Sequence, residues 1–559
     1  MFLRSMNLRR YRGIEALEWQ PNPGVNCIVG PGDSGKSTIL AAISLLLTPR
    51  PVGAASEYDF HRRRLEEGFE ITAVIGGLDD AVISAMRVPA LRGWKDGQVL
   101  DLPDEEGAEP VLVARVIGSP ELEVRHELLP PSGEPFQFSV AVRQRLFLSR
   151  VSGEERAGRE LRLGQGSLLE RHIGEIDFRP ALSAAVATAS ANLQLPEEAN
   201  QSLEKLRMLF GKAGLPKDLQ LGIIAPQGSS LLGMVGLLSG DPGEAIPLAY
   251  AGTGTKQLAL FLLTAALVKA EPVLVLDEPE TGLEPYRQRS TVSELRKIIG
   301  KTGQAFLATH SPAILEAMQP GEIWRLAPGG NPVRLDDASI IKIIDDAPDA
   351  MLSRVPVLCE GPTEAGLLRP LLDDLASKSA LASIDSLGIR LVARTGQPMV
   401  LEEAKAMLKA GIPCGVFVDC EQRHSGKRQA LKEQEACAFS CWEGVRNIEE
   451  AVARWVPWEK LQDIVALAAS LQEQSVESLL QQVGERAGKP GKSTLQDLAG
   501  QVGDECVRDA LAKAIEDRVW FKSEDRGASL GRRLLEIGIP GEINAHISSF
   551  WSRLLALLR

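Results

Sequence analysis

Residues 30–37 constrain the fold of this chain more than any other segment. They read Gly-Pro-Gly-Asp-Ser-Gly-Lys-Ser and match the pattern G-x-x-x-x-G-K-[ST] of a phosphate-binding loop at every required position. An apolar stretch at 25–29 precedes the loop, and an apolar, helix-forming stretch at 39–47 follows it. Such a loop connects a strand to a helix, so the sequence predicts an α/β fold built on a parallel sheet.

The chemistry of this loop suits a nucleotide triphosphate. Glycines let backbone N–H groups turn towards phosphate oxygens, Lys36 can reach the β- and γ-phosphates, and Ser37 can offer its hydroxyl to Mg²⁺. We therefore expect ATP and Mg²⁺ as cofactors. The residues predicted to bind the nucleotide here are Gly30, Gly32, Asp33, Ser34, Gly35, Lys36, Ser37 and Thr38.

A second segment supplies the remaining groups that ATP hydrolysis needs. The apolar stretch 273–276 reads as a buried strand, and Asp277 at its end is placed to hold the Mg²⁺. The next residue, Glu278, is placed to polarise the attacking water as a catalytic group. His310 follows another apolar stretch, 304–307, and is expected to contact the γ-phosphate. A chance glycine-rich turn at 30–37 would leave this second half unexplained.

Together these motifs, over residues 1 to about 325, resemble the ABC-type ATPase heads of the RecF and structural-maintenance-of-chromosomes kind. In that family the signature motif of one head completes the nucleotide site of another, which implies a homodimer or higher homo-oligomer. The matching segment is 251–257, with Gly252 and Gly254 as the nucleotide-binding residues. Gly252 stands where the family has a serine, so a hydroxyl contact to the phosphate is missing.

Carboxylates gather at two predicted strand ends later in the chain. Glu360 follows the apolar stretch 356–359, and Glu364 lies four residues further on. Asp419 and Glu421 follow the apolar stretch 416–418, and residues two apart in an extended segment point to one side. A lone glutamate is usually a solvated side chain. A set of four suits a hard divalent cation such as Mg²⁺ or Mn²⁺, with Ca²⁺ as an alternative.

This order of acids resembles the Toprim fold of topoisomerases, primases and certain nucleases, although Glu421 stands where the second aspartate is usual. An ABC head followed by Toprim resembles the overcoming-lysogenisation-defect (OLD) family of ATP-dependent nucleases, which includes the nuclease subunit of Gabija phage-defence systems. The resemblance implies Glu449 as a further metal ligand and Lys522 as a catalytic cation. The implied site comprises Glu360, Glu364, Asp419, Glu421 and Glu449 as ligands, with Glu360, Asp419 and Lys522 as catalytic residues.

The predicted fold class is an α/β chain with an ABC-type ATPase head, a helical insertion and a Toprim domain with helical C-terminal elements. The predicted domains are residues 1–345 for the ATPase, 350–450 for the Toprim core and 451–559 for a helical part that completes the nuclease site. Residues 140–235 are predicted to be a helical insertion and a candidate dimerisation element. Its clearest helices are expected at 181–192 and 198–210.

Composition limits the compartment and the partners. The chain carries 62 Lys+Arg against 74 Asp+Glu, a net charge of −12, which argues against a DNA binder coated in basic surface. No apolar run reaches the ~20 residues of a membrane span. The chain has seven cysteines and no Cys-x-x-Cys pair, which argues against a framework of disulfide bonds. We therefore expect the protein in the cytoplasm.

The leading hypothesis is an ATP-binding and ATP-hydrolysing DNA endonuclease that depends on a divalent metal, in phage defence or DNA processing. Expected partners are DNA and further copies of the chain, with a helicase or another defence protein as a further partner. The four tyrosines all lie at or before Tyr286, so metal-assisted hydrolysis by water is simpler than a covalent phosphotyrosine. The alternative is a nucleotide-gated scaffold or sensor whose Toprim module binds DNA or a partner without cleaving.

Overall fold

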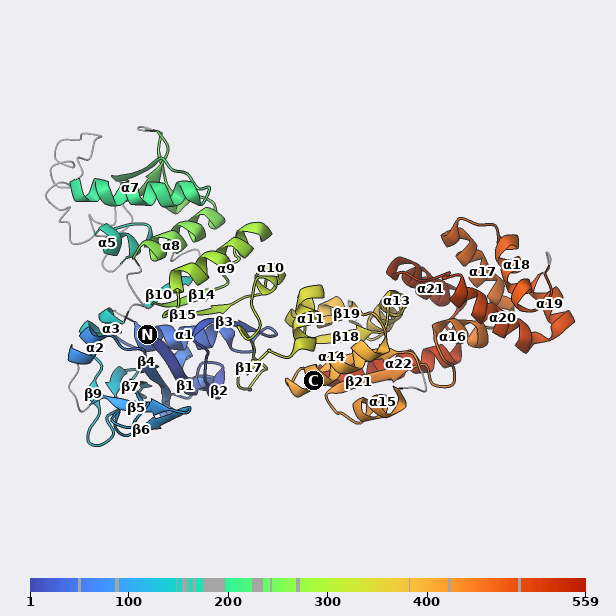
Figure 1. The fold of residues 1–559 in the computed structure, drawn as a ribbon, viewed down its shortest axis with the longest axis horizontal. Helices are drawn as coiled ribbons and strands as arrows, with labels where there is room; N and C mark the ends of the chain where they lie inside the picture. Colours follow the sequence, from blue (N-terminus) through green and yellow to red (C-terminus); the bar gives the residue numbers. More distant parts are fainter. Residues whose placement is uncertain are drawn as a thin grey trace. The chain divides into compact units, whose positions relative to one another are not determined.

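The computed structural model divides into two compact units, Met1–Leu335 and Asp336–Arg559. In Figure 1 the first unit runs from blue to green and the second from yellow to red. The structure describes residues 1–48, 52–85, 90–146, 148–152, 158, 160–163, 167–173, 197–223, 235–241, 244–267, 272–381, 383–420, 424–490 and 494–558.

A parallel sheet forms the centre of the first unit. Its strands are, in spatial order, β10 (Leu148–Ser152), β14 (Val273–Asp277), β15 (Gln304–Ala308), β3 (Gly24–Val29), β16 (Ile323–Arg325) and β17 (Val333–Arg334). All neighbours pair in parallel except β17, which pairs antiparallel with β16. Helices α8 (Thr253–Leu267), α9 (Pro285–Ile299) and α10 (Pro312–Glu316) lie on one side (Figure 1). Strands β14 and β15 are buried along nearly their whole length, as parallel strands covered on both faces require.

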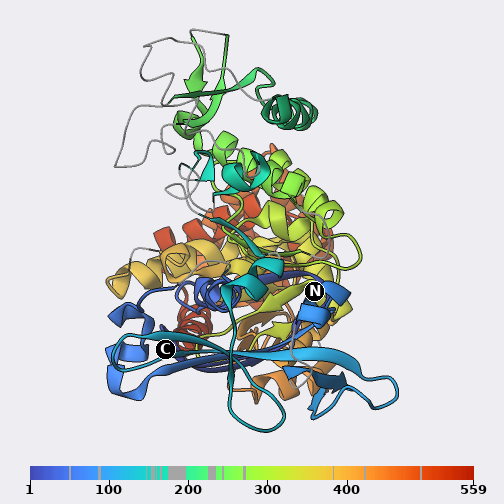
Figure 2. The same ribbon diagram turned by 90° about the vertical axis from the view of Figure 1, so that its left-hand side faces the viewer.

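An antiparallel sheet forms the other layer of this unit (Figure 2). Its strands are β2 (Ile14–Trp19), β1 (Phe2–Tyr11), β4 (Phe69–Gly76), β7 (Glu109–Gly118), β5 (Arg92–Lys95) and β6 (Gln98–Leu100), with β8 (Val124–Leu128) and β9 (Phe136–Gln137) beyond β7. Helix α1 (Lys36–Leu47) packs into the same core as β1, β4, β14 and β15. Its Ile39, Leu40 and Ile43 are fully buried, which explains why this helix is apolar nearly all round. A short helix, α2 (Asp80–Ala85), also belongs to this unit.

The helical insertion predicted at about 140–235 is helical only in part among its described residues. This segment contains helices α3 (Val140–Arg145), α5 (Leu168–Ile173) and α7 (Glu197–Lys212), but also strand β10 of the central sheet. It further contributes β11 (Leu219–Ile223) and β12 (Val235–Ser239), which form an antiparallel sheet with β13 (Ile246–Pro247). Long-range pairing of β10 with β14 overrides the helical pattern around it. The helix expected at 198–210 is α7, and the one expected at 181–192 lies outside the described residues.

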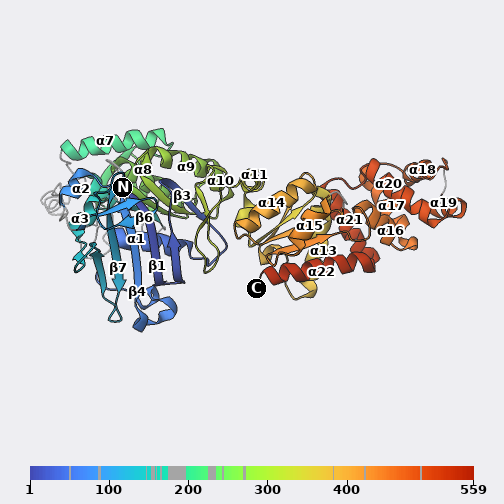
Figure 3. The ribbon, with the colours of Figure 1, turned by 60° about the horizontal axis from the view of Figure 1, so that its bottom comes forward.

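The second unit is built on another parallel sheet, with spatial order β19 (Ile389–Ala393), β18 (Val355–Cys359), β20 (Cys414–Val418) and β21 (Cys437–Cys441). Helices α13 (Pro362–Lys378) and α22 (Gly541–Leu557) lie on one face, and α14 (Gln397–Lys409) and α15 (Ser425–Lys432) lie on the other (Figure 3). β18 and β20 are buried at every position. Their apolar sequences therefore place the chemistry of this unit at the strand ends.

Helices complete the second unit. They are α11 (Ala338–Asp346), α12 (Asp349–Leu352), α16 (Ile448–Trp455), α17 (Trp458–Gln472), α18 (Val476–Arg486), α19 (Leu495–Val502), α20 (Asp504–Asp517) and α21 (Glu524–Ile537). The unit boundary lies at 335/336, about ten residues before the predicted one, because α11 packs against α14 and so belongs to the second unit. Residues 350–450 and 451–559 form one unit with a shared core.

The crossing of α13 and α21 holds that core together. A Cβ at Gly366 would lie 2.0 Å from the carbonyl oxygen of Glu524, and one at Gly527 would lie 2.4 Å from that of Thr363. Only glycine allows the two backbones to come this close. The hydroxyl of Thr363 also donates to the carbonyl oxygen of Phe521 over 3.2 Å. The start of α13, which follows Glu360, is thereby joined to the turn that carries Lys522.

A buried histidine predicts how the stability of the first unit depends on pH. Burial lowers the pKa of His126 to about 4, and its ring Nε2 donates to the carbonyl oxygen of Leu45 over 2.8 Å. Because the unfolded chain takes up this proton near the ordinary pKa of about 6.5, stability is lost as pH falls from there towards 4. We expect the burial of His126 to lower the free energy of unfolding by about 2 kcal/mol near pH 5, relative to neutral pH.

Urea unfolding of the wild type and His126→Gln, near pH 7.5 and near pH 5, measures this effect. The glutamine keeps an N–H donor but does not titrate. The variant should therefore lose about 2 kcal/mol less stability than the wild type on acidification. Equal acid sensitivity in the two proteins would contradict the assignment.

Candidate functional site

The phosphate-binding loop lies between β3 and α1, as the sequence predicts. Gly30 has φ +152° and Gly35 φ +101°, and a Cβ at Gly30 would lie 2.2 Å from the carbonyl oxygen of Leu326. Lys36 Nζ donates to the carbonyl oxygens of Gly30 and Pro31 over 3.0 and 2.8 Å. Its ammonium group thus lies inside the loop, where a phosphate can replace these carbonyls as its partner.

Several features show that this loop fits an anion. Burial lowers the pKa of Lys36, while the negative charges of Asp33, Glu278 and Asp277 act in the opposite direction. The hydroxyl of Ser34 is buried and has no hydrogen-bond partner among the described residues. A phosphate oxygen would supply the partner for Ser34 and the counter-charge for Lys36. Thr38 follows in the first turn of α1 and is half-buried.

The two halves of the predicted nucleotide site meet in the structure. Ser37 Oγ donates to Asp277 Oδ1 over 3.0 Å, although the residues are 240 positions apart. Both oxygens suit Mg²⁺, because this ion prefers hydroxyl, carboxylate and water ligands. Ser37 and Asp277 are therefore the residues that would hold the metal of a bound Mg-nucleotide.

Glu278 and His310 lie at the ends of neighbouring strands, and both are exposed. The backbone N–H of Glu278 donates to the carbonyl oxygen of Ala308 over 3.0 Å, and its φ of +49° turns the chain out of β14. Glu280 accepts a hydrogen bond from the backbone N–H of His310 over 2.7 Å. Glu280, which the sequence reasoning passed over, therefore connects the segments that carry Glu278 and His310.

The signature-like segment begins helix α8. Gly254 approaches the segment after β14 so closely that a Cβ would lie 2.2 Å from the carbonyl oxygen of Gly282. At Gly252 an added Cβ would meet no described atom within 4 Å. Gly254 thus has a packing role within the unit, whereas the open surroundings of Gly252 leave room for a ligand.

A buried arginine beside the loop was missed by the sequence reasoning. Arg325 ends β16, which pairs with β3 so that Arg325 is opposite Val29. Burial lowers the pKa of Arg325 to about 10, and its charge helps to lower the pKa of Lys36. In the sequence, Arg325 is recognisable only as an arginine at the end of a short apolar stretch. Its position beside the phosphate-binding loop depends on the strand order, which pairs β16 with β3.

The second candidate site lies at the carboxyl edge of the sheet in the second unit. Glu360 follows β18, and its Oε2 accepts hydrogen bonds from the backbone N–H of Asp419 over 2.9 Å and from Gln397 Nε2 over 3.2 Å. Gln397 Nε2 also donates to the carbonyl oxygen of Asp419 over 2.7 Å. Gln397, which is almost completely buried, was not predicted. It follows β19 after Thr395-Gly396 and fixes the distance between Glu360 and Asp419.

Glu364 and Glu449 belong to the same electrostatic cluster. Burial, followed by the negative charges of Glu449 and Glu360, raises the pKa of Glu364 to about 7. Burial also raises the pKa of Glu449, as do the charges of Glu516 and Glu360, whereas Lys522 lowers it. Glu360, Glu364, Glu449 and Lys522 were each singled out in the sequence, and the fold brings them within electrostatic reach of one another.

The donor chemistry of this cluster fits a hard divalent cation, because its groups are carboxylates that destabilise one another without a counter-charge. Glu421, a predicted ligand, lies outside the described residues. Across the described residues, no three His, Cys, Asp or Glu side chains converge on one point.

Comparison with known proteins supports an ATPase domain in the first unit. A family model described as "AAA domain, putative AbiEii toxin, Type IV TA system" matches residues 119–316, and one described as "AAA domain" matches residues 3–81. These matches confirm the prediction of a nucleotide-binding ATPase, at the level of an AAA-type ATPase domain in the first unit. No curated protein matches the chain.

Solved heads of Smc proteins align with this chain at low similarity. An SmcHead bound to the C-winged helix domain of ScpA aligns at 14% identity and TM-score 0.40, covering 61% of this chain and 100% of that chain. An Smc head with an extended coiled coil, bound to the C-terminal domain of ScpA and derived from Pyrococcus furiosus, aligns at 14% identity and TM-score 0.36. The alignment covers 62% of this chain and 98% of that chain. The SMC head domain from Thermotoga maritima aligns at 15% identity and TM-score 0.30, covering 60% of this chain and 100% of that chain.

No helix in the described part of the chain is long and apolar enough to cross a membrane.

The backbone contact at Gly254 gives a direct test of the first unit. We expect Gly254→Ala to lower Tm, because a Cβ 2.2 Å from a carbonyl oxygen forces a backbone shift that costs about 1–3 kcal/mol. Gly252→Ala is the matched control, since its Cβ would meet no described atom within 4 Å. Differential scanning fluorimetry measures the Tm of both variants. Equal Tm values for Gly254→Ala and Gly252→Ala would contradict the packing role of Gly254.

Proposed function

We propose that this protein is a DNA endonuclease of the OLD type that depends on ATP and a divalent metal, and that it acts in phage defence or DNA processing. One observation carries the proposal. It is supported, in the second unit, by the electrostatic influence of Glu360 and Glu449 on Glu364, and of Glu360 and Lys522 on Glu449, close to the end of β18 that Glu360 follows. In the same chain, this unit follows an AAA-type ATPase domain.

The residues of the cluster have distinct tasks in this proposal. Glu360, Glu364, Asp419, Glu421 and Glu449 are the proposed metal ligands. Hydrogen bonds from Asp419 and Gln397 orient the Glu360 carboxylate. Lys522 is exposed and offers positive charge to the phosphodiester undergoing cleavage. When bound, divalent ions at such a site supply an activated water and stabilise the leaving oxygen.

Nucleotide binding in the first unit would regulate this activity. Ser37 and Asp277 hold the Mg²⁺ of ATP, Glu278 polarises the attacking water and His310 contacts the γ-phosphate in this proposal. The open position at Gly252 suits a phosphate from the nucleotide site of a second copy, so we propose a homo-oligomer formed through the ATPase unit. Residues 140–235 remain the candidate dimerisation element, and a helicase or another defence protein remains a proposed partner.

A nucleotide-gated scaffold is the second candidate function. Its specific support is that, among the described residues, the carboxylates of the second unit do not converge on a metal position. In that case the second unit would bind DNA or a partner without cleaving, and ATP hydrolysis would respond to that partner.

Plasmid cleavage distinguishes these candidates. We expect the wild-type protein to nick supercoiled plasmid with Mg²⁺ or Mn²⁺. Glu360→Gln should lower the rate at least about 100-fold, because it removes a ligand charge while keeping the side-chain volume. Agarose gels of time courses measure the rates. Lys36→Ala, tested with and without ATP, shows whether nucleotide binding activates or inhibits cleavage.

Glu536→Gln is the matched control, since this exposed glutamate pairs with Arg533 on the surface of α21 and should retain wild-type activity. The proposal would be refuted by an intact plasmid under every combination of metal and nucleotide, or by equal nicking with wild type and Glu360→Gln. An intact plasmid together with partner-stimulated ATP hydrolysis would support the scaffold.

A further inference from the structure

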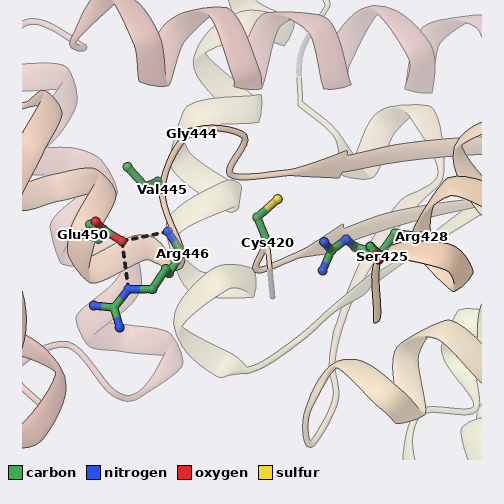
Figure 4. Close-up of a pocket in the computed structure, with 7 residues that line it drawn as sticks. All are labelled: Cys420, Ser425, Arg428, Gly444, Val445, Arg446 and Glu450. Atoms are coloured by element: carbon green, nitrogen blue, oxygen red, sulfur yellow. Dashed lines mark hydrogen bonds and ion pairs between the residues drawn. The ribbon is translucent and has the colours of Figure 1, made fainter. Parts of the chain in front are cut away.

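A cavity in the second unit lies beside the carboxylate cluster. Its volume is about 630 Å³, which is within the usual range of ligand pockets. Figure 4 shows Arg446 and Glu450 on one side, Arg428 and Ser425 on the other, and Cys420 between them. Gly444 and Val445 complete the lining. The groups that surround this space are mostly polar, which favours a polar occupant.

The charge of the lining favours an anion. Arg428 is buried and Arg446 is exposed. Glu450 accepts hydrogen bonds from the backbone N–H and Nε of Arg446 and also pairs with Arg454 over 2.8 Å. Burial raises the pKa of Glu450, but these hydrogen bonds and the two arginines outweigh burial and leave it below the ordinary value. Among the described residues of the lining, the ionised glutamate offsets one of two arginine charges, so the local charge remains positive.

The backbone adds to this preference. Helix α15 begins at Ser425 in the cavity wall. Among the described residues no side-chain hydrogen bond caps the start of α15. The first N–H groups of a helix attract negative charge, and the hydroxyl of Ser425 is a further donor at the same place. Two arginines, a hydroxyl and a helix start therefore surround the same space.

A hydrogen-bond chain links the cavity to the carboxylate cluster. Arg428 Nη1 donates to Gln397 Oε1 over 3.1 Å. Gln397 Nε2 in turn donates to Glu360 Oε2 and to the carbonyl oxygen of Asp419. Cys420, in the cavity lining, is the residue directly after Asp419. An anion held by Arg428 would thus be connected to Glu360 through two side chains, those of Arg428 and Gln397.

We propose that this cavity binds a backbone phosphate of the same DNA strand whose phosphodiester is engaged by the carboxylate cluster. The inference rests on the proposed nuclease function and adds how the strand is positioned. Arg446 donates to the phosphate oxygens from one wall, and Ser425 with the start of α15 donates from the other. Arg428, held by Gln397, contributes charge and fixes the distance between the cavity and Glu360.

Salt-dependent DNA binding tests this assignment. Full-length protein carrying Glu360→Gln, which keeps the DNA intact, is titrated into a fluorescein-labelled duplex at several salt concentrations, and anisotropy gives Kd. Adding Arg446→Ala should weaken binding about tenfold. It should also reduce the slope of log K against log salt by about 0.9, the value for one lost phosphate contact. Ser425→Asp should weaken binding as well, and its aspartate favours the start of a helix, so α15 should remain folded.

Lys378→Ala is the charge-matched control. It removes one exposed cation from the far end of α13, where Lys378 pairs with Asp374, and should leave both Kd and slope unchanged. An unchanged Kd and slope in Arg446→Ala would overturn the inference while leaving the plasmid result intact. The strand assignment would also be overturned if calorimetry with inorganic phosphate shows binding that Arg446→Ala abolishes without affecting DNA. If wild type never nicks plasmid but Arg446→Ala still lowers the salt slope, the nuclease proposal fails and the phosphate site stands.

Discussion

Burial of parallel strands on both faces determines where this protein can place its chemistry. β14, β15, β18 and β20 are almost entirely buried, so a charged side chain within them would lose its hydration without a partner. The first positions at which polar groups reach solvent are the carboxyl ends of the strands. Asp277, Glu360 and Asp419 occupy such positions. Both candidate sites therefore follow from the same constraint, applied once in each unit.

Close backbone contacts bring other segments of the chain next to these strand ends. Gly30, Gly254 and Gly527 each occupy a position where a Cβ would meet a carbonyl oxygen at 2.2–2.4 Å. These contacts connect segments that are distant in sequence, such as the signature-like segment and the one that follows β14. Hydrogen bonds across 240 residues, from Ser37 to Asp277, and across 158 residues, from Thr363 to Phe521, complete the same connections.

The two sites balance charge in opposite ways. At the phosphate-binding loop, Lys36 and the buried Arg325 offer positive charge to an anion. In the second unit, burial and neighbouring negative charges raise the pKa of Glu364 and Glu449, and Lys522 offsets part of this effect at Glu449. The cavity beside them is again lined by arginines, so the proposed strand has one phosphate at Arg428 and Arg446 and another at the carboxylate cluster. The overall acidity of the chain is compatible with nucleic-acid chemistry if ions occupy that cluster.

The sequence by itself determined the candidate nucleotide site and the candidate carboxylates, because strand–loop–helix patterns and acids after apolar runs are local signals. The proposed site role of Glu449 and Lys522 came from a family resemblance, since neither residue has a local pattern that distinguishes it from a surface side chain. Only the tertiary structure placed β10 in the central sheet, Arg325 beside Lys36, and Gln397 between Glu360, Asp419 and Arg428. Strand order and helix packing decide such neighbours, and both depend on contacts between residues far apart in the chain, which local periodicity does not record.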